Sequence, residues 1–504
     1  MTKKKTSTAA IDRRKKFDAS DSSHTRVNAR CDVAQTTDEN ASLWGRVDAL
    51  SAAAANNPAV RRTIRNRARY EVANNGYAKG IAQTLTNDTV GPTVQLQVSD
   101  GENAQQIEKD FDTWATEVHL WRKIRTMRMA KCVDGETFAL LTTNRKLKNR
   151  VKLDVKPIEC DMVESFFTGS GGRLKENEID GIRFDEDGNP DKYRILRTHP
   201  GDYRKEKGKT GGDWINAEYV LHYFGHDRPG QVRGVSELTP ALNLFGQMRK
   251  YTSAVLEAAS RAAEISAVMQ TDLVPDALAA DLADPVTILE AERNAIVSLP
   301  EGWKLNQLKA EQPSTAYGDF KAEIINEIAR CLDMPYNIAA CNSSGYNYAS
   351  GRLDHQTYDR SIEVEREDLK SMDLDRIFYA WLNEYATRNR LSPAEKQAAM
   401  AHEWYFAGRP HVDPTKEAKA DETRLKNGTL TKSAYYSKRG KDWKRETEQW
   451  IRERIESEQQ WARMREDAGL EPAPYPMADD TAAAAMDVED KLDDIDEKLD
   501  EREK

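Results

Sequence analysis

The sequence predicts a helix-rich α+β protein, and three patterns support that fold class. Between residues 57 and 230, apolar residues recur first at helical spacing and then at the alternating spacing of strands. Three long helical patterns follow, over 236–269, 315–332 and 352–387. Residues 411–470 are helical again and rich in charge. A mixed domain followed by long helices is expected of an α+β chain built from several parts.

Length and composition exclude several classes of protein. The chain has 504 residues, of which 32% are charged and 39% are hydrophobic. No apolar run approaches the roughly 20 residues that a membrane-spanning helix needs. The five cysteines are scattered without a CxxC pair, which is typical of reduced cytosolic thiols. A membrane protein, a disulfide scaffold and a collagen-like fibre are therefore excluded.

The two ends of the chain carry opposite charge. Residues 1–40 have no hydrophobic period, and the first 30 hold nine Lys and Arg against three Asp. Residues 471–504 form an acidic tail with a short apolar seam, made of Val488, Leu492, Ile495 and Leu499. We expect both ends to be disordered, because segments of this composition bury little apolar surface.

The first helical pattern, over residues 58–85, is unusually rich in arginine. Apolar residues at helical spacing alternate with arginines, namely Val60, Ile64, Ala68, Val72 and Tyr77 with Arg61, Arg62, Arg65, Arg67 and Arg69. The pattern fits an amphipathic helix with a solvated basic face. It also fits contact with nucleic acid or an acidic partner, and both interpretations stay open.

The rest of the mixed domain alternates helix and strand. We expect a strand at 94–98 after Gly91-Pro92, and a helix over 105–129. A period-two pattern then predicts strands at 137–143 and 151–155. Turn residues at 187–190 predict a hairpin of 182–184 with 193–195, and 219–224 is one more apolar run.

The helices after residue 235 differ in their surfaces. The pattern over 236–269 has Pro240 in its first turn and small residues in its second half, including Ala254, Ala258 and Ala262, which allow close helix approach. Residues 273–312 are punctuated by proline, and we expect them to form a small separate lobe. The helix over 352–387 is charged nearly all round in its first half and has an apolar stripe in its second. A loop of small polar residues, glycines and tyrosines, 341–351, precedes it.

Catalytic and metal-binding signals are weak. Gly208-Lys209-Thr210 resembles the end of a phosphate-binding loop, but Tyr203 stands where the first glycine of that motif is needed. His222 and His226 are four residues apart without the glutamate of a zinc-binding helix. We therefore predict no enzyme, no cofactor and no metal site.

Four stretches, in order, resemble the lambda-like family of tailed-bacteriophage portal proteins. The resemblance runs from about Arg61 to Gly440. The stretches are 69–78 with Val90-Gly91; 134–138; 220–224 with 228–236; and Trp404 with 408–410 and 412–418.

The resemblance implies a ring subunit with named parts. They are a basic arm (1–40), a mixed α/β wing (41–235, returning at 390–410), two stem helices (236–269 and 314–333), a small clip lobe (270–313), a tunnel loop region (334–350), a long helix behind the channel (351–389), a helical crown (411–470) and an acidic tail (471–504).

The resemblance also implies function and partners. Portal proteins form a ring, usually twelve-fold, at one capsid vertex, where they conduct the genome during packaging and ejection. Expected partners are further copies of this chain, double-stranded DNA bound without sequence specificity, terminase, a head–tail connector protein and the major capsid or scaffold protein, with no membrane. The expected location is the portal vertex of the virion, and the host cytoplasm during assembly.

Particular residues take roles under this resemblance. Tunnel-loop side chains would touch phosphate and sugar without reading bases, and they are Asn342, Ser343, Ser344, Tyr346, Asn347 and Tyr348, with Arg352 adding one charge. A wall of closely packed or all-round charged helices suits a ring interface, for which we expect Ala254, Ala258, Ala262, Glu363 and Arg366. Alternatives are a capsid or scaffold protein without DNA contact and, less favoured, a DNA-packaging enzyme.

Overall fold

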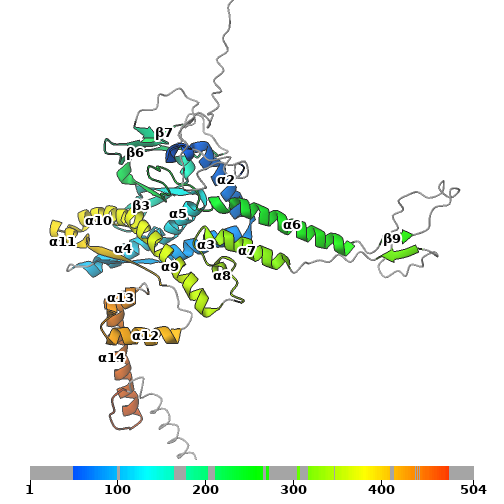
Figure 1. Ribbon diagram of the computed structural model, residues 1–504. Coiled ribbons are helices and arrows are strands. Elements are labelled where there is room, and N and C mark those ends of the chain that lie inside the picture. Colours follow the sequence, from blue (N-terminus) through cyan, green and yellow to red (C-terminus); the bar gives the residue numbers. More distant parts are fainter. Residues whose placement is uncertain are drawn as a thin grey trace, which may run out of the picture.

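The computed structural model describes residues 42, 49–98, 103–163, 177–202, 211–264, 268–271, 303–306, 316–345, 347–408, 414–437, 439, 441 and 443–475. It confirms a helix-rich α+β chain (Figure 1). The basic arm, most of the clip lobe, Gly208 to Thr210 and the seam of the acidic tail lie outside these residues. Within them, no helix combines the length and apolarity needed to cross a bilayer.

The first half of the chain follows the predicted order, but both predicted helices, over 58–85 and over 105–129, are divided in two. Its helices are α1 (Ala52–Ala55), α2 (Pro58–Asn74), α3 (Gly76–Val90), α4 (Ala104–Glu117) and α5 (Leu120–Asp134). The expected single helix over 105–129 breaks because His119 adopts a left-handed conformation, with φ of 54°. The break changes the direction of the chain, and Trp114 before it and Trp121 after it are both buried.

The predicted strands after α5, together with β4 and β7, which were not predicted, form two small antiparallel sheets. One has the order β3-β2-β8, from β2 (Glu136–Thr143), β3 (Leu153–Ile158) and β8 (Val220–Phe224). The other has the order β4-β5-β6-β7, from β4 (Glu178–Ile179), β5 (Ile182–Phe184), β6 (Pro190–Leu196) and β7 (Gly212–Asn216). Because β2 pairs with β8 from Glu136↔Phe224 onward, sequence stretches 134–138 and 220–224 lie together.

A segment from the second half of the chain, residues 375–406, packs with the first half to form one unit, which we call the body. Strand β11 (His402–Phe406) pairs antiparallel with β1 (Val94–Val98), in the register Val94↔Phe406. Helices α10 (Asp375–Asn389) and α11 (Pro393–Ala399) precede β11. The predicted apolar stripe of α10 is buried, and an aromatic cluster joins it to α4, with Phe111 5.2 Å from Trp381 between ring centres.

Two helices run side by side away from this body (Figure 1). They are α6 (Leu242–Glu264) and α7 (Ala316–Arg330), and the Tyr317 hydroxyl donates to Thr252 Oγ1 across them at 3.2 Å. At their far end β9 (Val268–Thr271) pairs with β10 (Trp303–Asn306).

The helix predicted over 236–269 extends beyond α6, the helix observed there, at both ends. Its start is delayed because Ser236 Oγ and the Glu237 N–H both donate to the Cys132 carbonyl, which holds this segment against the body. A short 3-10 helix, Thr239–Ala241, follows before α6 begins. Its end comes early because Val268 already belongs to a strand.

The second half of the chain contains one nearly continuous helical rod. Helix α8 (Tyr336–Ala339) leads through a loop to α9 (Tyr348–Leu369), then to a π-helix (Lys370–Leu374) and directly into α10. Helices α12 (Pro414–Lys426), α13 (Lys432–Ser437) and α14 (Trp443–Asp467) lie beside the body (Figure 1), and α14 has no buried residue.

Candidate nucleic-acid interface

The predicted tunnel loop is a short exposed connection between α8 and α9. Residues 341–345 and Asn347 are exposed, and Tyr346 lies outside the described residues. Helix α9 begins at Tyr348, whose side chain is likewise outside them, so the loop ends earlier than the predicted 341–351. The predicted tunnel loop region, 334–350, also included α8, a single helical turn.

Local hydrogen bonds fix the turn of this loop. Cys341 and Gly345 both have left-handed conformations, with φ of 51° and 77°. Between them Asn342 Oδ1 accepts from the backbone N–H of Ser344 at 2.9 Å and from its hydroxyl at 2.7 Å. An asparagine that bonds its own chain two residues on is a common turn former. The turn thus has a defined shape while its polar groups stay exposed.

Both flanking helices support the loop at its base. The Asn342 N–H donates to the Asn337 carbonyl at 3.0 Å. The Asn337 side chain in turn lies 3.1 Å from Nε2 of His355 on α9. Because α8 and α9 are tied together in this way, the loop projects from a braced base.

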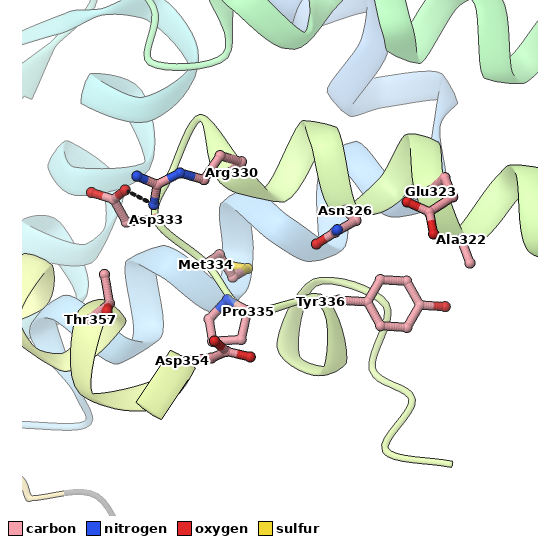
Figure 2. A pocket seen from close by; sticks show the side chains of 10 residues that line it. All are labelled: Ala322, Glu323, Asn326, Arg330, Asp333, Met334, Pro335, Tyr336, Asp354 and Thr357. Carbon is pink, nitrogen blue, oxygen red and sulfur yellow. Dashed lines mark hydrogen bonds and ion pairs between the residues drawn. The ribbon is translucent and has the colours of Figure 1, made fainter. Parts of the chain in front are cut away.

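A hollow of about 520 Å³ lies beside the loop, between α7, α8 and α9 (Figure 2). Figure 2 shows Arg330 and Asp333 paired on one side, at 2.7 Å, and Asp354 and Thr357 of α9 on the other. The pair is exposed, with 74% and 45% of the two side chains accessible. The hollow is an open, polar surface feature with charges of both signs.

The chemistry of the loop favours weak contact with a polyanion. Asn342 and Ser343 offer uncharged hydrogen-bond donors, and the exposed Arg352 in the first turns of α9 adds a cation. Donors of this kind can bond phosphate and sugar oxygens without reading bases. With few cations, little counterion release would hold the polyanion in place.

The predicted ring-interface residues fall into two groups. Ala254 and Glu363 are exposed and Ala258 is half-buried, whereas the side chain of Ala262 is not among those described. Arg366 is engaged inside its own chain, where it donates to the carbonyls of Thr89 at 2.9 Å and Asp88 at 2.8 Å, and its guanidinium lies over the Phe406 ring.

The arginines of α2 fit the interpretation of a solvated basic face only in part, because Arg62 and Arg67 are exposed whereas others are buried. Arg61 and Arg65 are only 4% and 5% exposed, whereas Val60 on the expected apolar face is 37% exposed. Arg65 lies 2.7 Å from Asp161, and Arg61 lies 3.0 Å from Asp180. The helix is turned with these arginines inward because acidic partners from distant strands and turns meet them there.

The centre of this charge network is Glu136, at the start of β2. It is fully buried, and Arg233 donates to both of its carboxylate oxygens at 2.7 and 2.8 Å. The Gly234 N–H adds a third bond at 3.0 Å. Burial alone would raise the pKa of Glu136, but Arg233 and these bonds hold the pKa well below its usual range.

Two glycines bring the strands of this centre into backbone contact. Gly135 has φ of 92°, and a Cβ there would lie 2.3 Å from the Val235 carbonyl carbon. A Cβ on Gly234 would lie 2.0 Å from the Gly135 carbonyl oxygen. No side chain fits at either position, so stretches 134–138 and 228–236 carry structural residues that hold the body together.

His222 also belongs to this interior. Its ring is stacked between Phe138 and Phe224, each 4.2 Å away between ring centres, and its Nε2 lies 3.3 Å from Glu136. Burial lowers the pKa of His222 to about 4, so the ring is neutral at physiological pH. Nearby, Glu159, Asp161 and His199 approach each other, but Arg69 already pairs with Asp161 at 2.9 Å.

A second buried network ties the rod to the body. Lys131 of α5 donates to both oxygens of Glu365 on α9 at 2.6 Å, and the Tyr223 hydroxyl donates to the same carboxylate. Arg128 lies 3.0 Å from Glu237, just before the 3-10 helix that leads into α6. The network therefore connects α9, the sheet and the start of α6.

Sequence reasoning missed one further buried group. Asp373, in the π-helix, is 0% exposed, and neither carboxylate oxygen has a hydrogen-bond partner among the described residues. Burial raises the pKa of Asp373 to about 7. An aspartate next to the apolar Leu374, where the charged half of the helix meets its apolar stripe, was the available signal.

Comparisons with known proteins were made by family and by structure. The family model described as "Phage portal protein, lambda family" matches residues 40–366. The probable portal protein of Halomonas phage phiHAP-1 is 24% identical over 414 residues, which cover 75% of this chain and 77% of that protein. Portal protein B of Escherichia phage lambda is 25% identical over 189 residues, 36% of this chain and 34% of that protein.

Solved structures with similar chains include particle necks and a portal protein. A chain from the neck of an empty gene transfer agent particle, computed with C6 symmetry, has a TM-score of 0.45 and 12% identity, covering 72% of this chain and 88% of that one. A HK97 family phage portal protein from Corynebacterium diphtheriae has a TM-score of 0.31 and 13% identity, with coverage of 70% and 98%. Since the family model matches well over half of the sequence, this chain belongs to the lambda family of phage portal proteins.

Proposed function

We propose that identical copies of this chain close into a ring of twelve at one vertex of a phage capsid, and that double-stranded DNA passes through the centre. The observation that carries the proposal is the braced loop between α8 and α9, exposed at 341–345 and at Asn347 and with uncharged donors at its tip, in a chain of the portal family. The ring would assemble in the host cytoplasm and remain at the portal vertex of the virion. Its role is structural and not enzymatic.

The wing comprises 41–235 and 390–410 in this proposal. The pairing of β1 with β11 supports a single unit, because strands about 300 residues apart share one ladder. The contact between the aromatic rings of Phe111 and Trp404, 5.6 Å apart between ring centres, supports it as well, since α4 and β11 come from the two halves of the chain.

The stem comprises 236–269 and 314–333, and the clip comprises 270–313. Contacts between α6 and α7 support a paired stem, including the Tyr251 ring 4.9 Å from that of Phe320. The hairpin of β9 and β10 lies at the end farthest from the body (Figure 1), which suits a docking surface. Terminase would bind there during packaging and the head–tail connector protein afterwards.

The remaining parts face the channel and the capsid interior. The loop within 334–350 lines the bore, the helices of 351–389 stand behind it, and 411–470 form the crown. The major capsid or scaffold protein would contact the wing. DNA would be held weakly and without sequence specificity, because Asn342, Ser343 and Arg352 offer few charges.

Assembly is the first test. Native mass spectrometry and negative-stain microscopy of the purified full chain should show closed rings with a central hole. A chain that stays monomeric at high concentration, with and without scaffold protein, would contradict the proposal.

Loop chemistry is the second test. Ser343→Asp with Asn347→Asp places acid at the exposed loop, where it would repel phosphate. We expect intact rings and a severe loss of packaged DNA per particle. The matched control, Gln105→Asp with Thr113→Asp, changes two exposed residues of α4 and should package normally. Equal packaging by both variants would favour a structural protein that does not touch DNA.

A further inference from the structure

A groove of about 710 Å³ crosses the face formed by α2, α3 and α5. Its floor is apolar, with Val72, Met129 and Val133 contributed by α2 and α5. Val133 is buried, while Val72 and Met129 are partly exposed. An apolar floor with open access is typical of a surface that another molecule covers.

The rim of this groove is basic. Four arginines and lysines line it against one acidic residue, and Arg69 and Asp134 of this set pair with each other at 2.7 Å. Lys79 on α3 and Arg122 on α5 are exposed, and neither forms an ion pair with another residue that the structure describes. The groove therefore presents positive charge around an apolar floor.

The outer face of α9 has the complementary character. Val364 is 60% exposed, although it is apolar. Glu363 and Glu367 flank it, and both are exposed. Lys370 pairs with Glu367 at 2.9 Å in an exposed contact, which leaves that carboxylate 71% accessible. The exposed Arg360 lies one turn before Val364, so this face carries charges of both signs. Its two glutamates and Val364 match the groove in charge and in polarity.

The two surfaces point in opposite directions because α3 and α9 pack against each other. The Tyr358 hydroxyl of α9 donates to Asp88 of α3 at 2.9 Å, which marks the faces in contact. At 3.6 residues per turn, Lys79 lies about 180° from Asp88 around α3. By the same spacing, Glu367 lies about 180° from Tyr358 around α9. The groove that Lys79 lines therefore faces away from the α3–α9 contact on one side, and the face of α9 that carries Glu367 faces away from it on the other.

We propose that the outer face of α9, around Glu363, Val364 and Glu367, docks into the groove of α2, α3 and α5 on the next copy of this chain. The inference rests on the proposed ring and names the two surfaces that form its wing contact. Val364 meets the apolar floor, and the two glutamates meet Lys79 and Arg122.

A second copy fits this groove because one chain carries both halves of the contact. Two different, complementary patches on opposite sides of a subunit produce head-to-tail association, which closes into a ring when the rotation per subunit allows it. An unrelated acidic partner would occupy the groove but leave the exposed Val364 of α9 uncovered.

Charge reversal with rescue tests the pairing in the full-length chain. The groove variant is Lys79→Glu with Arg122→Glu, and the helix variant is Glu363→Lys with Glu367→Lys. Each should raise the concentration for half-assembly roughly tenfold or more, because like charges then oppose each other across the contact. All four substitutions together should restore rings, since the charges are again complementary. Sedimentation velocity across a dilution series measures each midpoint.

The control and the outcomes separate this inference from the ring itself. Arg145→Glu with Lys146→Glu makes the same charge change at exposed residues outside both surfaces and should assemble as the wild type does. Circular dichroism should show that every variant is folded. If the wild type forms rings while the groove variant assembles equally well, the pairing is wrong and the ring stands. Loss of assembly in both variants without rescue by the fourfold variant also overturns the pairing.

Discussion

Helices α2 and α9 are both crowded with charge, and each carries some of it inward, as at Arg65 of α2 and Glu365 of α9, and some of it outward. On α2 the side chains of Arg61 and Arg65 point inward and are almost fully buried. On α9 Glu363 and Glu367 stay on the surface. The difference lies in what reaches each helix, because Asp161 and Glu136 approach α2 from distant parts of the chain. Composition gives the charge of a helix, but the side chains that approach it from distant parts of the chain decide which of its charged residues are buried.

The largest effect should come from removing the centre of the inward network. Glu136→Gln keeps the shape but leaves Arg233 buried without its anion, so we expect a loss of about 3–5 kcal/mol in the free energy of unfolding. Urea denaturation followed by tryptophan fluorescence measures it. The exposed Glu186→Gln is the control and should leave the midpoint unchanged. A small loss at Glu136 would mean that the inward charges are dispensable.

A buried charge without a partner should behave in the reverse way. The raised pKa of Asp373, about 7 against an ordinary 3.8, means that the folded chain binds this proton more tightly than the unfolded chain. Its stabilising contribution is complete below pH 4 and is lost as the pH rises through about 7. Three pKa units correspond to about 4 kcal/mol.

Asp373→Asn should remove this dependence. We expect the variant to match the wild type near pH 4 and to be more stable by a few kcal/mol at pH 8, because the amide has no charge to bury. Urea midpoints at pH 4.5, 6 and 8 show the widening difference. Asp187→Asn, at an exposed turn, should give a difference that does not change with pH. A constant difference for Asp373→Asn would contradict the assignment.

A matched pair on α2 compares the two faces of one helix. Arg65→Ala should lower the free energy of unfolding by about 2 kcal/mol, which is less than the loss expected for Glu136→Gln. The reason is that Glu136 keeps its pair with Arg233, and Asp161 keeps its pair with Arg69. Arg67→Ala, two residues along on the exposed face, should cost under about 0.5 kcal/mol. Thermal unfolding of both variants gives the contrast. Equal losses would show that the network does not distinguish the faces.

The smallest effect on stability is expected on the outer face of α9. Glu363→Ala should change the free energy of unfolding by less than about 0.5 kcal/mol, because the side chain is exposed and has no bonded partner in the described part of the chain. Urea denaturation measures it. A loss above 1 kcal/mol would place Glu363 among the internal charges and break the contrast with α2.

Local patterns predicted most elements of this fold. Alternation indicated β2, an apolar run indicated β8, and the apolar stripe of α10 around Phe378 and Trp381 is buried as expected. Division of the helix at His119 was not predictable, because a left-handed residue there has no local signature. The partner of β1 was also hidden, since its hydrogen bonds join residues about 300 positions apart.

The candidate site was predicted in part. Small polar residues and Gly345 indicated an exposed loop near 341–351, and the structure places one there. The basic groove could not be predicted, because Lys79 and Arg122 come from separate helices that meet only through folding. The inward turn of Arg65 was missed for the same reason, as its partner Glu136 is 71 residues away.

The contact of Gly135 with Gly234 has a consequence for biosynthesis. Glu136 and Arg233 are 97 residues apart. The Glu136 carboxylate therefore cannot be buried and bonded by its partners before Arg233 and Gly234 have left the ribosome. Until then the Glu136 carboxylate, at the start of β2, stays exposed to water. This part of the chain therefore cannot complete its folding until Arg233 and Gly234 have been synthesised. A ribosome that pauses before codon 233 would prolong the interval in which β2 can associate with the wrong strand.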